Sequence, residues 1–483
     1  MRKWWPLVTV CLGTFMLLVD VTIVNVALPR MAGDLRASFG SLQWVVDGYA
    51  LSLGVLLLGA GALADRAGHR RLYAAGLVLF ALSSLACGLA GNDALLIAAR
   101  VVQGIGGAAL FTTTFALLNS SYQGRERGIA YGIWGGVSGA AAAVGPVLGG
   151  VLTDALSWRW IFLVNLPISV AALVLTLTVL RADGPARRGR FDLAGLLTFT
   201  VAATALTLAL IRSIPSLYVV SAVALALFVL IERRSPAPMI DLALLRNRTF
   251  TGVLIAALLV NFAAFAMLTY TSIWLQSLLA LTPLQAGLTA LPMGVLSLIV
   301  SGVAGARLHG RSPRVLIGSG MLLIFAGGLL EVMLIGPGSS WPALLPGFAV
   351  IGLGVGLVMP NLAESAMAAV PVDRGGMAAG TLNTARQLGF AIGVAVVGSA
   401  FVSRATTFLS SAGVGDAATT AHGLASGQGG RLLAFVPEPL LRGAAAGGLD
   451  VGFAVAAGAG LVGALAVFWL VKPAPKPVLV AAG

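Results

Sequence analysis

GALADRAGHRR, the stretch from Gly61 to Arg71, is a short charged segment between two long apolar runs. It holds one aspartate, three arginines and a histidine, whereas the runs centred near residues 55 and 82 carry almost no charge. About 20 mainly apolar residues are enough for a helix to cross a bilayer. The stretch therefore indicates two membrane-spanning helices joined by a tight polar turn.

A second stretch of the same character, GVAGARLHGRSPRVL, runs from Gly302 to Leu316. Both stretches are Gly-rich and basic, and each follows the second apolar run of its part of the chain. This internal repeat predicts two halves of six helices, with two extra helices between them. The resulting fourteen spans are expected to centre near residues 17, 55, 82, 106, 140, 170, 201, 222, 262, 295, 324, 351, 390 and 460.

The composition indicates an all-α membrane protein. Hydrophobic residues make up 58% of the 483 residues and charged residues only 10%, whereas soluble domains carry roughly 25% charged residues. The 62 glycines suit close packing of helices in lipid. The two cysteines, Cys11 and Cys87, lie in apolar runs, so no disulfide framework is expected. The first span lacks a cleavage signal and is interpreted as a retained helix.

The basic residues predict the orientation. Most of the 30 lysines and arginines fall in loops on the side of the N-terminus, so both termini of this multi-pass protein are expected in the cytoplasm. Because these residues are dispersed among loops, the net charge of +13 favours contact with membrane lipid over binding of nucleic acid. The expected domains are an N-terminal six-helix bundle (1–182), two extra helices with flanking cytoplasmic loops (183–245), a C-terminal six-helix bundle (246–472) with a long extracellular connection at about 403–449, and a cytoplasmic tail (473–483).

Three motifs in this order resemble signatures of the major facilitator superfamily. GALADRAGHRR resembles its loop signature, RVVQGIGGA (Arg100 to Ala108) its fourth-helix signature, and GVSGAAAAVGPVLGG (Gly136 to Gly150) the fifth-helix signature of its antiporters. LVDVTIVNVALP, SWRWIFLVNLP and GTLNTARQLGFAIGVAV resemble its fourteen-helix drug:proton antiporter branch. The resemblance covers Leu12 to Leu470 and implies the fold of that superfamily. WVVDGYAL departs from the commoner form, because Asp47 stands where a small polar residue is usual.

The loop motif implies a conformational lock. Its matching residues are Gly61, Asp65, Arg66, Gly68, Arg70 and Arg71, while His69 stands where a basic residue is usual. Asp65 can sit against the N-terminus of another helix, and the arginines can bind carboxylates or lipid phosphate. The alternative is an ordinary positively charged loop that only sets topology. The second copy has Ala306 in place of the aspartate, so any lock is asymmetric.

The fifth-helix motif implies close packing between antiporter helices. Its matching residues are Gly139, Gly145, Pro146, Gly149 and Gly150. Glycines permit tight helix contacts and the proline permits bending. Packing of small residues without any role in antiport is the alternative.

Asp20 and Arg100 are charged residues inside predicted spans. At ~1.5 Å per residue, Asp20 lies ~22 Å from Trp5 in a core of ~30 Å, and Arg100 lies ~9 Å below the opposite face. The two are therefore expected at similar depth. Burial favours the neutral form of a carboxylic acid and a nearby arginine favours its charged form, so Asp20, Arg100 and Asp47 are the predicted proton-coupling residues. A permanent structural pair of Asp20 with Arg100 is the alternative.

The resemblance implies a proton-coupled antiporter that exports amphiphilic small molecules such as drugs, antibiotics or dyes. Polar residues in the spans are candidates for its central substrate cavity, namely Asn25, Gln103, Asn165, Asn261, Glu331 and Arg386. Arg386 is expected either to bind an anionic substrate group or to hydrogen-bond to helix carbonyls. The acids in the outer half favour cationic substrates, although the branch members with the aspartate at position 47 include exporters of other antibiotics.

No cofactor other than the proton is expected, and the protein is expected to act as a monomer. The sequence has no nucleotide-binding G-x-x-x-x-G-K-[ST] motif. Its three histidines, His69, His309 and His422, are too scattered for a metal site. No nucleophile and base stand out as catalytic residues, which disfavours the remote alternative of an intramembrane enzyme. An uptake facilitator or a lipid flippase of the same fold is the alternative function.

Overall fold

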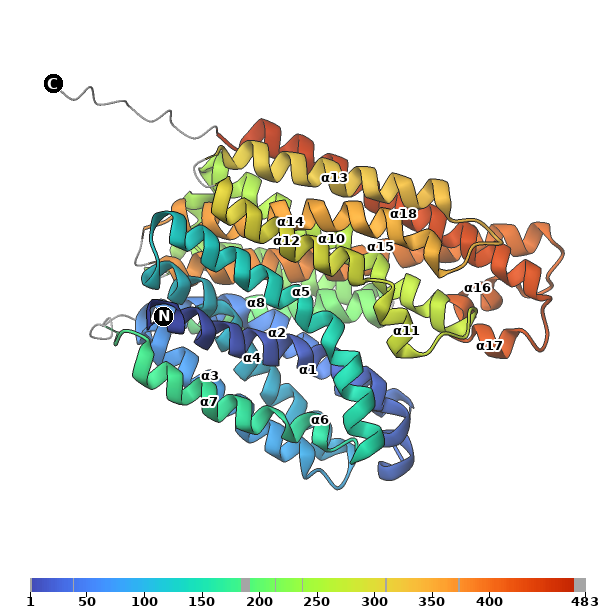
Figure 1. Ribbon diagram of the computed structural model, residues 1–483, viewed down its shortest axis with the longest axis horizontal. Coiled ribbons are helices and arrows are strands. Elements are labelled where there is room, and N and C mark those ends of the chain that lie inside the picture. The colour runs from blue at the N-terminus through green and yellow to red at the C-terminus, as the bar shows by residue number, and fades with distance from the viewer. Residues whose placement is uncertain are drawn as a thin grey trace.

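The computed structural model describes residues 2–37, 39–183, 192–212, 214–236, 238–308, 311–371 and 374–472. All regular elements within these ranges are helices (Figure 1). Thirteen of them are long and apolar enough to cross a membrane. The helix α5 (Gly124–Ala155) is 32 residues long and occupies the place of the span predicted near residue 140. The all-α architecture with fourteen spans is therefore confirmed, while the tail predicted for 473–483 lies outside the described residues.

The N-terminal half holds the first six spans. Its helices are α1 (Trp5–Leu35), α2 (Phe39–Ala67), α3 (His69–Gly88), α4 (Asp93–Ser121), α5, and the pair α6 (Trp160–Leu163) and α7 (Asn165–Val179), preceded by the 3-10 helix η1 (Arg2–Trp4). α4 packs against α2 and α3, and α5 packs against α1. The turn between α2 and α3 needs Gly68, whose φ of 104° disfavours other residues.

The fifth-helix motif lies where α5 packs on α1. A Cβ on Gly145 would overlap the Thr22 hydroxyl and lie 3.2 Å from the Val19 carbonyl oxygen, so the glycine permits this approach. Gly149 is buried, whereas a side chain at Gly150 would have space around it. The side-chain surroundings of Gly139 and Pro146 lie outside the described residues. The structure thus gives a packing reason for Gly145.

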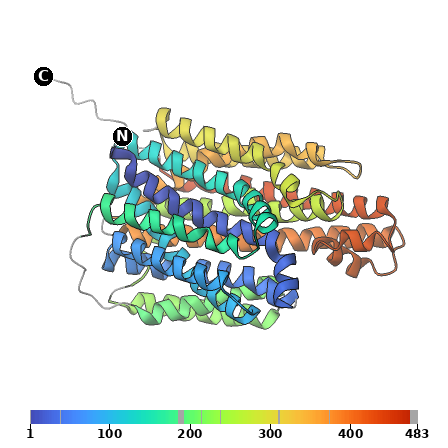
Figure 2. The same cartoon turned by 60° about the horizontal axis from the view of Figure 1, so that its bottom comes forward.

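The two extra helices, α8 (Leu193–Arg212) and α9 (Pro215–Arg234), form a hairpin on the outside of α2 (Figure 2). Phe199 of α8 and Phe228 of α9 pack in one cluster with Leu58 of α2 and with Met239. α8 also touches the helix α15 (Gly375–Ser411) of the other half. The hairpin therefore lies at the edge of the bundle, beside the seam between the halves.

The C-terminal half holds the last six spans. Its helices are α10 (Arg248–Ser277), α11 (Pro283–Leu288), α12 (Leu291–Arg307), α13 (Pro313–Leu334), α14 (Leu344–Ala368), α15, α16 (Ala417–Ala425), α17 (Gly429–Leu432) and α18 (Glu438–Leu470), with the 3-10 helices η2 (Leu242–Arg246) and η3 (Trp341–Ala343). α13 packs against α14 and α18, and α10 packs against α15 and α18.

The connection between α15 and α18 is shorter than predicted. The expected span-free segment at about 403–449 is helical at both ends, because α15 continues to Ser411 and α18 begins at Glu438. The remainder contains α16 and α17, and Ala421 and Leu424 of α16 are buried in the large hydrophobic core cluster. The Gly- and Ala-rich composition of this segment thus serves helix packing.

The two halves meet at the end of the bundle where α1 begins and α18 ends, here named the base (Figure 1). α2 crosses α15 there, and α5 crosses α12. A Cβ on Gly128 of α5 would lie 2.7 Å from the carbonyl oxygen of Gly305 on α12. Both crossings therefore depend on backbones that approach without side chains between them.

Candidate functional site

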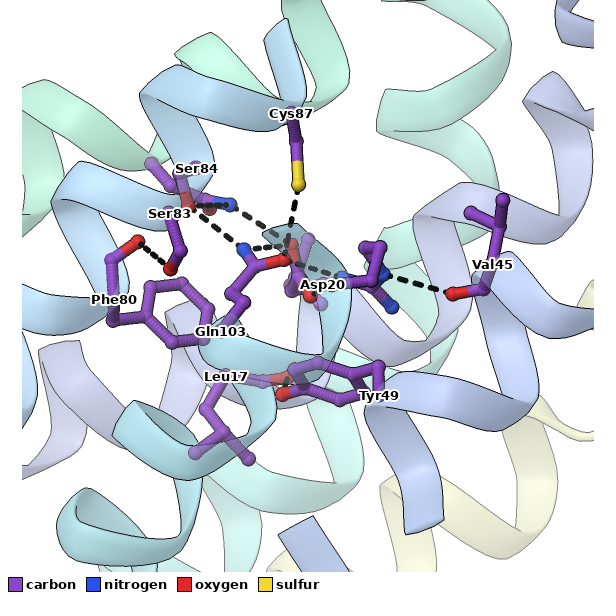
Figure 3. Close-up of polar contacts among 12 residues, drawn as sticks. Leu17, Asp20, Val45, Tyr49, Phe80, Ser83, Ser84, Cys87 and Gln103 are labelled. Atoms are coloured by element: carbon purple, nitrogen blue, oxygen red, sulfur yellow. Dashed lines mark hydrogen bonds and ion pairs between the residues drawn. The ribbon is translucent and has the colours of Figure 1, made fainter. Parts of the chain in front are cut away.

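Asp20 and Arg100 form an ion pair in the interior of the N-terminal half. Figure 3 shows Asp20 among the polar contacts that surround it. The Arg100 Nη1 atom donates to Asp20 Oδ2 at 2.5 Å. The exposed fractions of the two residues are 0% and 1%. Asp20 and Arg100 lie 80 positions apart in the chain. They were expected at similar depth in the membrane, and the structure places them in contact.

The second carboxylate oxygen of Asp20 accepts two amide hydrogen bonds. Gln103 Nε2 donates to Oδ1 at 3.1 Å and Asn165 Nδ2 donates to it at 2.9 Å. Gln103 Nε2 also donates to Ser84 Oγ at 2.7 Å. Gln103 and Asn165, two of the residues predicted to line the substrate cavity, are both buried around Asp20. We name Asp20, Arg100, Gln103 and Asn165 the Asp20 network.

Arg100 has further partners that hold it in place. Its Nε donates to the Val45 carbonyl oxygen at 3.0 Å, and its Nη1 also donates to Gln103 Oε1 at 2.7 Å. The guanidinium carbon lies 4.0 Å from the centre of the Tyr49 ring, a cation–π distance. Helices α1, α2, α3, α4 and α7 therefore all contribute to one buried polar cluster. Asp47 is half-buried on the same helix as Val45 and Tyr49, α2.

The loop motif joins the two halves at the base. Asp65, near the end of α2, accepts hydrogen bonds from the backbone N–H groups of Gly376 and Met377 at 2.6 and 2.7 Å. These residues form the first turn of α15, so the carboxylate sits at a helix N-terminus, as expected. His69 Nε2 lies 3.4 Å from the same carboxylate. A Cβ on Gly61 would overlap the carbonyl oxygen of Gly376, so this contact requires glycine.

Arg70 of the motif and the backbone of Arg71 bind to α7 and to Asp183, which follows it. Arg70 Nε donates to the Thr176 carbonyl oxygen at 3.1 Å, and Arg66 Nη1 lies 3.5 Å from the Ala62 carbonyl oxygen. The backbone N–H groups of Arg70 and Arg71 donate to Asp183 at 3.1 and 2.8 Å. Asp183 therefore caps α3 as Asp65 caps α15. The sequence interpretation missed Asp183, although an acidic residue in so basic a segment is a usable signal.

Three of the remaining substrate candidates, Glu331, Asn261 and Arg386, lie apart from the Asp20 network. Glu331 is fully buried between α13 and α14, against Gly347. Asn261 on α10 donates to the Ala257 carbonyl oxygen of its own helix at 3.1 Å. Arg386 lies on α15, and the side chain of Asn25 lies outside the described residues. Within the described ranges, no group of three or more His, Cys, Asp or Glu side chains could hold a metal ion.

Comparison of the sequence with known families and proteins gives consistent matches. Residues 10–394 match the family described as the Major Facilitator Superfamily. The chain is 38% identical over 403 residues to the multidrug resistance protein Stp of Mycobacterium tuberculosis, which covers 81% of this chain and 75% of that protein. It is 35% identical over 438 residues to the puromycin resistance protein pur8 of Streptomyces alboniger, covering 87% of each. The chain is 33% identical over 417 residues to the tetracenomycin C resistance and export protein of Streptomyces glaucescens, covering 83% of this chain and 77% of that protein.

Solved transporters have the same fold. The human organic anion transporter MFSD10 (TETRAN) matches with a TM-score of 0.65 at 17% identity, over 96% of this chain and 99% of that chain. The proton:xylose symporter XylE matches with a TM-score of 0.65 at 12% identity, over 98% and 96%. The chain therefore belongs to the major facilitator superfamily of membrane transporters, in its fourteen-helix branch of drug and antibiotic resistance exporters.

Proposed function

We propose that this protein is a proton-coupled antiporter that exports amphiphilic small molecules, such as drugs, antibiotics or dyes, across the cytoplasmic membrane. The observation that carries the proposal is the buried ion pair of Asp20 and Arg100. Relatives that are named for multidrug, puromycin and tetracenomycin C resistance support the cargo class. The proton and the cargo are the only ligands that this function needs.

Asp20 can act as a proton carrier because its ionised form depends on its surroundings. In this conformation three donors hold the carboxylate, and removing one partner of such a buried pair is strongly unfavourable. A protonated Asp20 no longer pairs with the charge of Arg100. Proton uptake therefore requires α1 and α4 to change their arrangement, which links the proton to the conformational cycle.

The contact of Asp65 with α15 supplies the second part of the cycle. Its two hydrogen bonds join the halves at the base, and an inward-opening movement has to break them. We assign the base to the cytoplasmic side, so this conformation is closed toward the cytoplasm. Asp65, His69 and the glycine crossings together act as the conformational lock.

Transport into everted membrane vesicles tests the function. With a proton gradient that is acid inside, vesicles containing the protein should accumulate amphiphilic dyes and antibiotics above vesicles that lack it. A protonophore should abolish the accumulation. An uptake facilitator would equilibrate the same compounds regardless of the gradient, and a lipid flippase would move a headgroup-labelled phospholipid instead. Either of these results would contradict the proposal.

Cysteine labelling tests the orientation. Gln123, between α4 and α5 at the base, and Ala434, between α17 and α18, are both exposed. After replacement of the buried Cys11 and Cys87 by serine, an impermeant maleimide should label Ala434→Cys only in intact cells and Gln123→Cys only in everted vesicles. Labelling of both positions from one side would refute the proposed topology.

A further inference from the structure

Arg386 is a cation in the interior of the C-terminal half, at its contact with the other half. It lies in the first third of α15, a helix that packs against α2 and α4 of the N-terminal half. A Cβ added to Gly54 of α2 would lie 3.9 Å from the Cβ of Gln387, the residue that follows Arg386 on α15. A charged side chain at this depth is costly and is by default a mark of function.

The guanidinium of Arg386 lacks a counter-charge. Its Nη1 donates to Asn383 Oδ1 at 3.2 Å, and its Nε is buried without a hydrogen-bond partner. Among the residues that the structure describes, no carboxylate lies within ion-pair distance of it. Arg100 differs in each respect, because a carboxylate, a backbone carbonyl and an amide oxygen surround it.

Asn383 adds a second unused donor beside Arg386. The side chain is fully buried, its Oδ1 contacts Arg386, and its Nδ2 has no partner. A buried polar group without a partner is rare and calls for a ligand or water. Two adjacent donors without partners, one of them charged, match an anion.

The surroundings of this pair are apolar and aromatic. The guanidinium carbon of Arg386 lies 5.7 Å from the centre of the Phe111 ring on α4. Phe111 in turn lies 6.4 Å from Trp134 on α5. A ligand whose anionic group reaches Arg386 would therefore place its apolar part near rings of the N-terminal half. Such a ligand contacts both halves, as a transported molecule must.

We propose that Arg386 and Asn383 bind the anionic group of the cargo, so that the preferred substrates are amphiphiles bearing a carboxylate, sulfonate or phenolate. This inference rests on the proposed export function, because it assumes that the ligand is cargo. It also departs from the expectation that acids in the spans select cations: Asp20 is neutralised by Arg100, whereas Arg386 has an unused positive charge.

Two fluorescent probes of the same ring system test the charge preference. The purified protein in phosphatidylcholine nanodiscs is titrated with 8-anilinonaphthalene-1-sulfonate, which is anionic, and with N-phenyl-1-naphthylamine, which lacks the sulfonate. Empty nanodiscs give the background. Arg386→Gln should weaken saturable binding of the sulfonate by about 10- to 100-fold, the usual range for a lost charge-assisted hydrogen bond. Binding of the neutral probe should change far less, and Arg386→Lys should restore much of the sulfonate affinity.

Matched variants separate the site from general effects of charge. Arg404→Gln removes an exposed arginine from the same helix and should leave the sulfonate affinity unchanged. Asn383→Asp places a carboxylate beside Arg386 and should abolish the preference for the sulfonate, which keeps the test available if Arg386→Gln does not fold. Equal sulfonate affinity in wild type, Arg386→Gln and Asn383→Asp would overturn the proposal.

The same titration distinguishes cargo from lipid and from failure of the proposed function. If phosphatidylglycerol in the nanodiscs displaces the sulfonate probe from the site, a lipid headgroup is the occupant and the assignment to cargo is overturned. Binding needs no proton gradient. Charge-selective binding without gradient-driven transport would therefore refute the export function but support the anion site. Gradient-driven transport that depends neither on cargo charge nor on Arg386 would support the export function but refute the anion site.

Discussion

Asp20→Asn should bind cargo but lose all export that is driven by a proton gradient. The amide keeps the size of the side chain but cannot take up and release a proton. Arg100 would keep the Gln103 amide oxygen, the Val45 carbonyl oxygen and the Tyr49 ring as partners, so the variant should fold. Downhill exchange of cargo between the two sides should remain. The measurements are probe binding in nanodiscs and accumulation in everted vesicles, each compared with wild type.

A purely structural ion pair predicts a different pattern. Losing one partner of a buried pair costs about 3–5 kcal/mol, so either single variant, Asp20→Asn or Arg100→Ala, would then fold poorly and the double variant would recover. A proton carrier instead predicts that both single variants insert and bind cargo but lose gradient-driven accumulation, and that the double variant does not recover it. Accumulation of cargo against a gradient by Asp20→Asn would exclude the carrier role.

Asp65→Asn should lower the transport turnover on the order of tenfold, which corresponds to a loss of ~1.4 kcal/mol from the closed base. Asp65 accepts two backbone N–H groups at the start of α15, and the asparagine offers a single neutral oxygen to them. The charge also interacts favourably with the helix N-terminus. Opening at the base can be followed at Ala378, which is fully buried in the first turns of α15. A cysteine there should react faster with maleimide in Asp65→Asn.

Asp183→Asn is the matched control for this experiment. Asp183 also accepts two backbone N–H groups at a helix N-terminus, those of Arg70 and Arg71 at the start of α3. These hydrogen bonds lie at the start of α3 rather than at α15, so the loss of charge should not affect closure at the base. The two variants could instead have equal effects on maleimide reactivity at position 378, or Asp65→Asn could keep full turnover. Either result would show that the loop motif only sets the topology.

The sequence predicts the spans and the depth of their charges better than it predicts which way each helix faces. Asp20 and Arg100 could be matched because depth follows from counting residues along a helix. The rotation of a helix is harder to predict, since lipid tails and helix neighbours are equally apolar and leave no clear periodicity. For this reason the sequence predicted Gln103 and Asn165 as cavity residues without showing that both donate to Asp20.

The connection after α15 shows a second limit of sequence interpretation. Residues 438–449 are Gly- and Ala-rich and read as part of a loop, yet they form the first turns of α18. Leu441 and Ala444 there are fully buried. Tertiary packing therefore stabilises this part of the helix, which local hydropathy does not predict. Asp183 binds backbone N–H groups, so its acidic charge within a basic segment was the sequence signal for its role.

The placement of Asp20 in one half and Arg386 in the other has an electrical consequence. A proton and an anion that occupy separate sites need not neutralise each other during the cycle. Exchange of one inward proton for one outward monovalent anion then moves two elementary charges in the same electrical direction. At 100 mV this corresponds to ~4.6 kcal/mol, roughly a two-thousandfold gradient of cargo, whereas a neutral cargo would gain half that energy. The transporter would therefore be most strongly electrogenic for the substrates that its unpaired arginine selects.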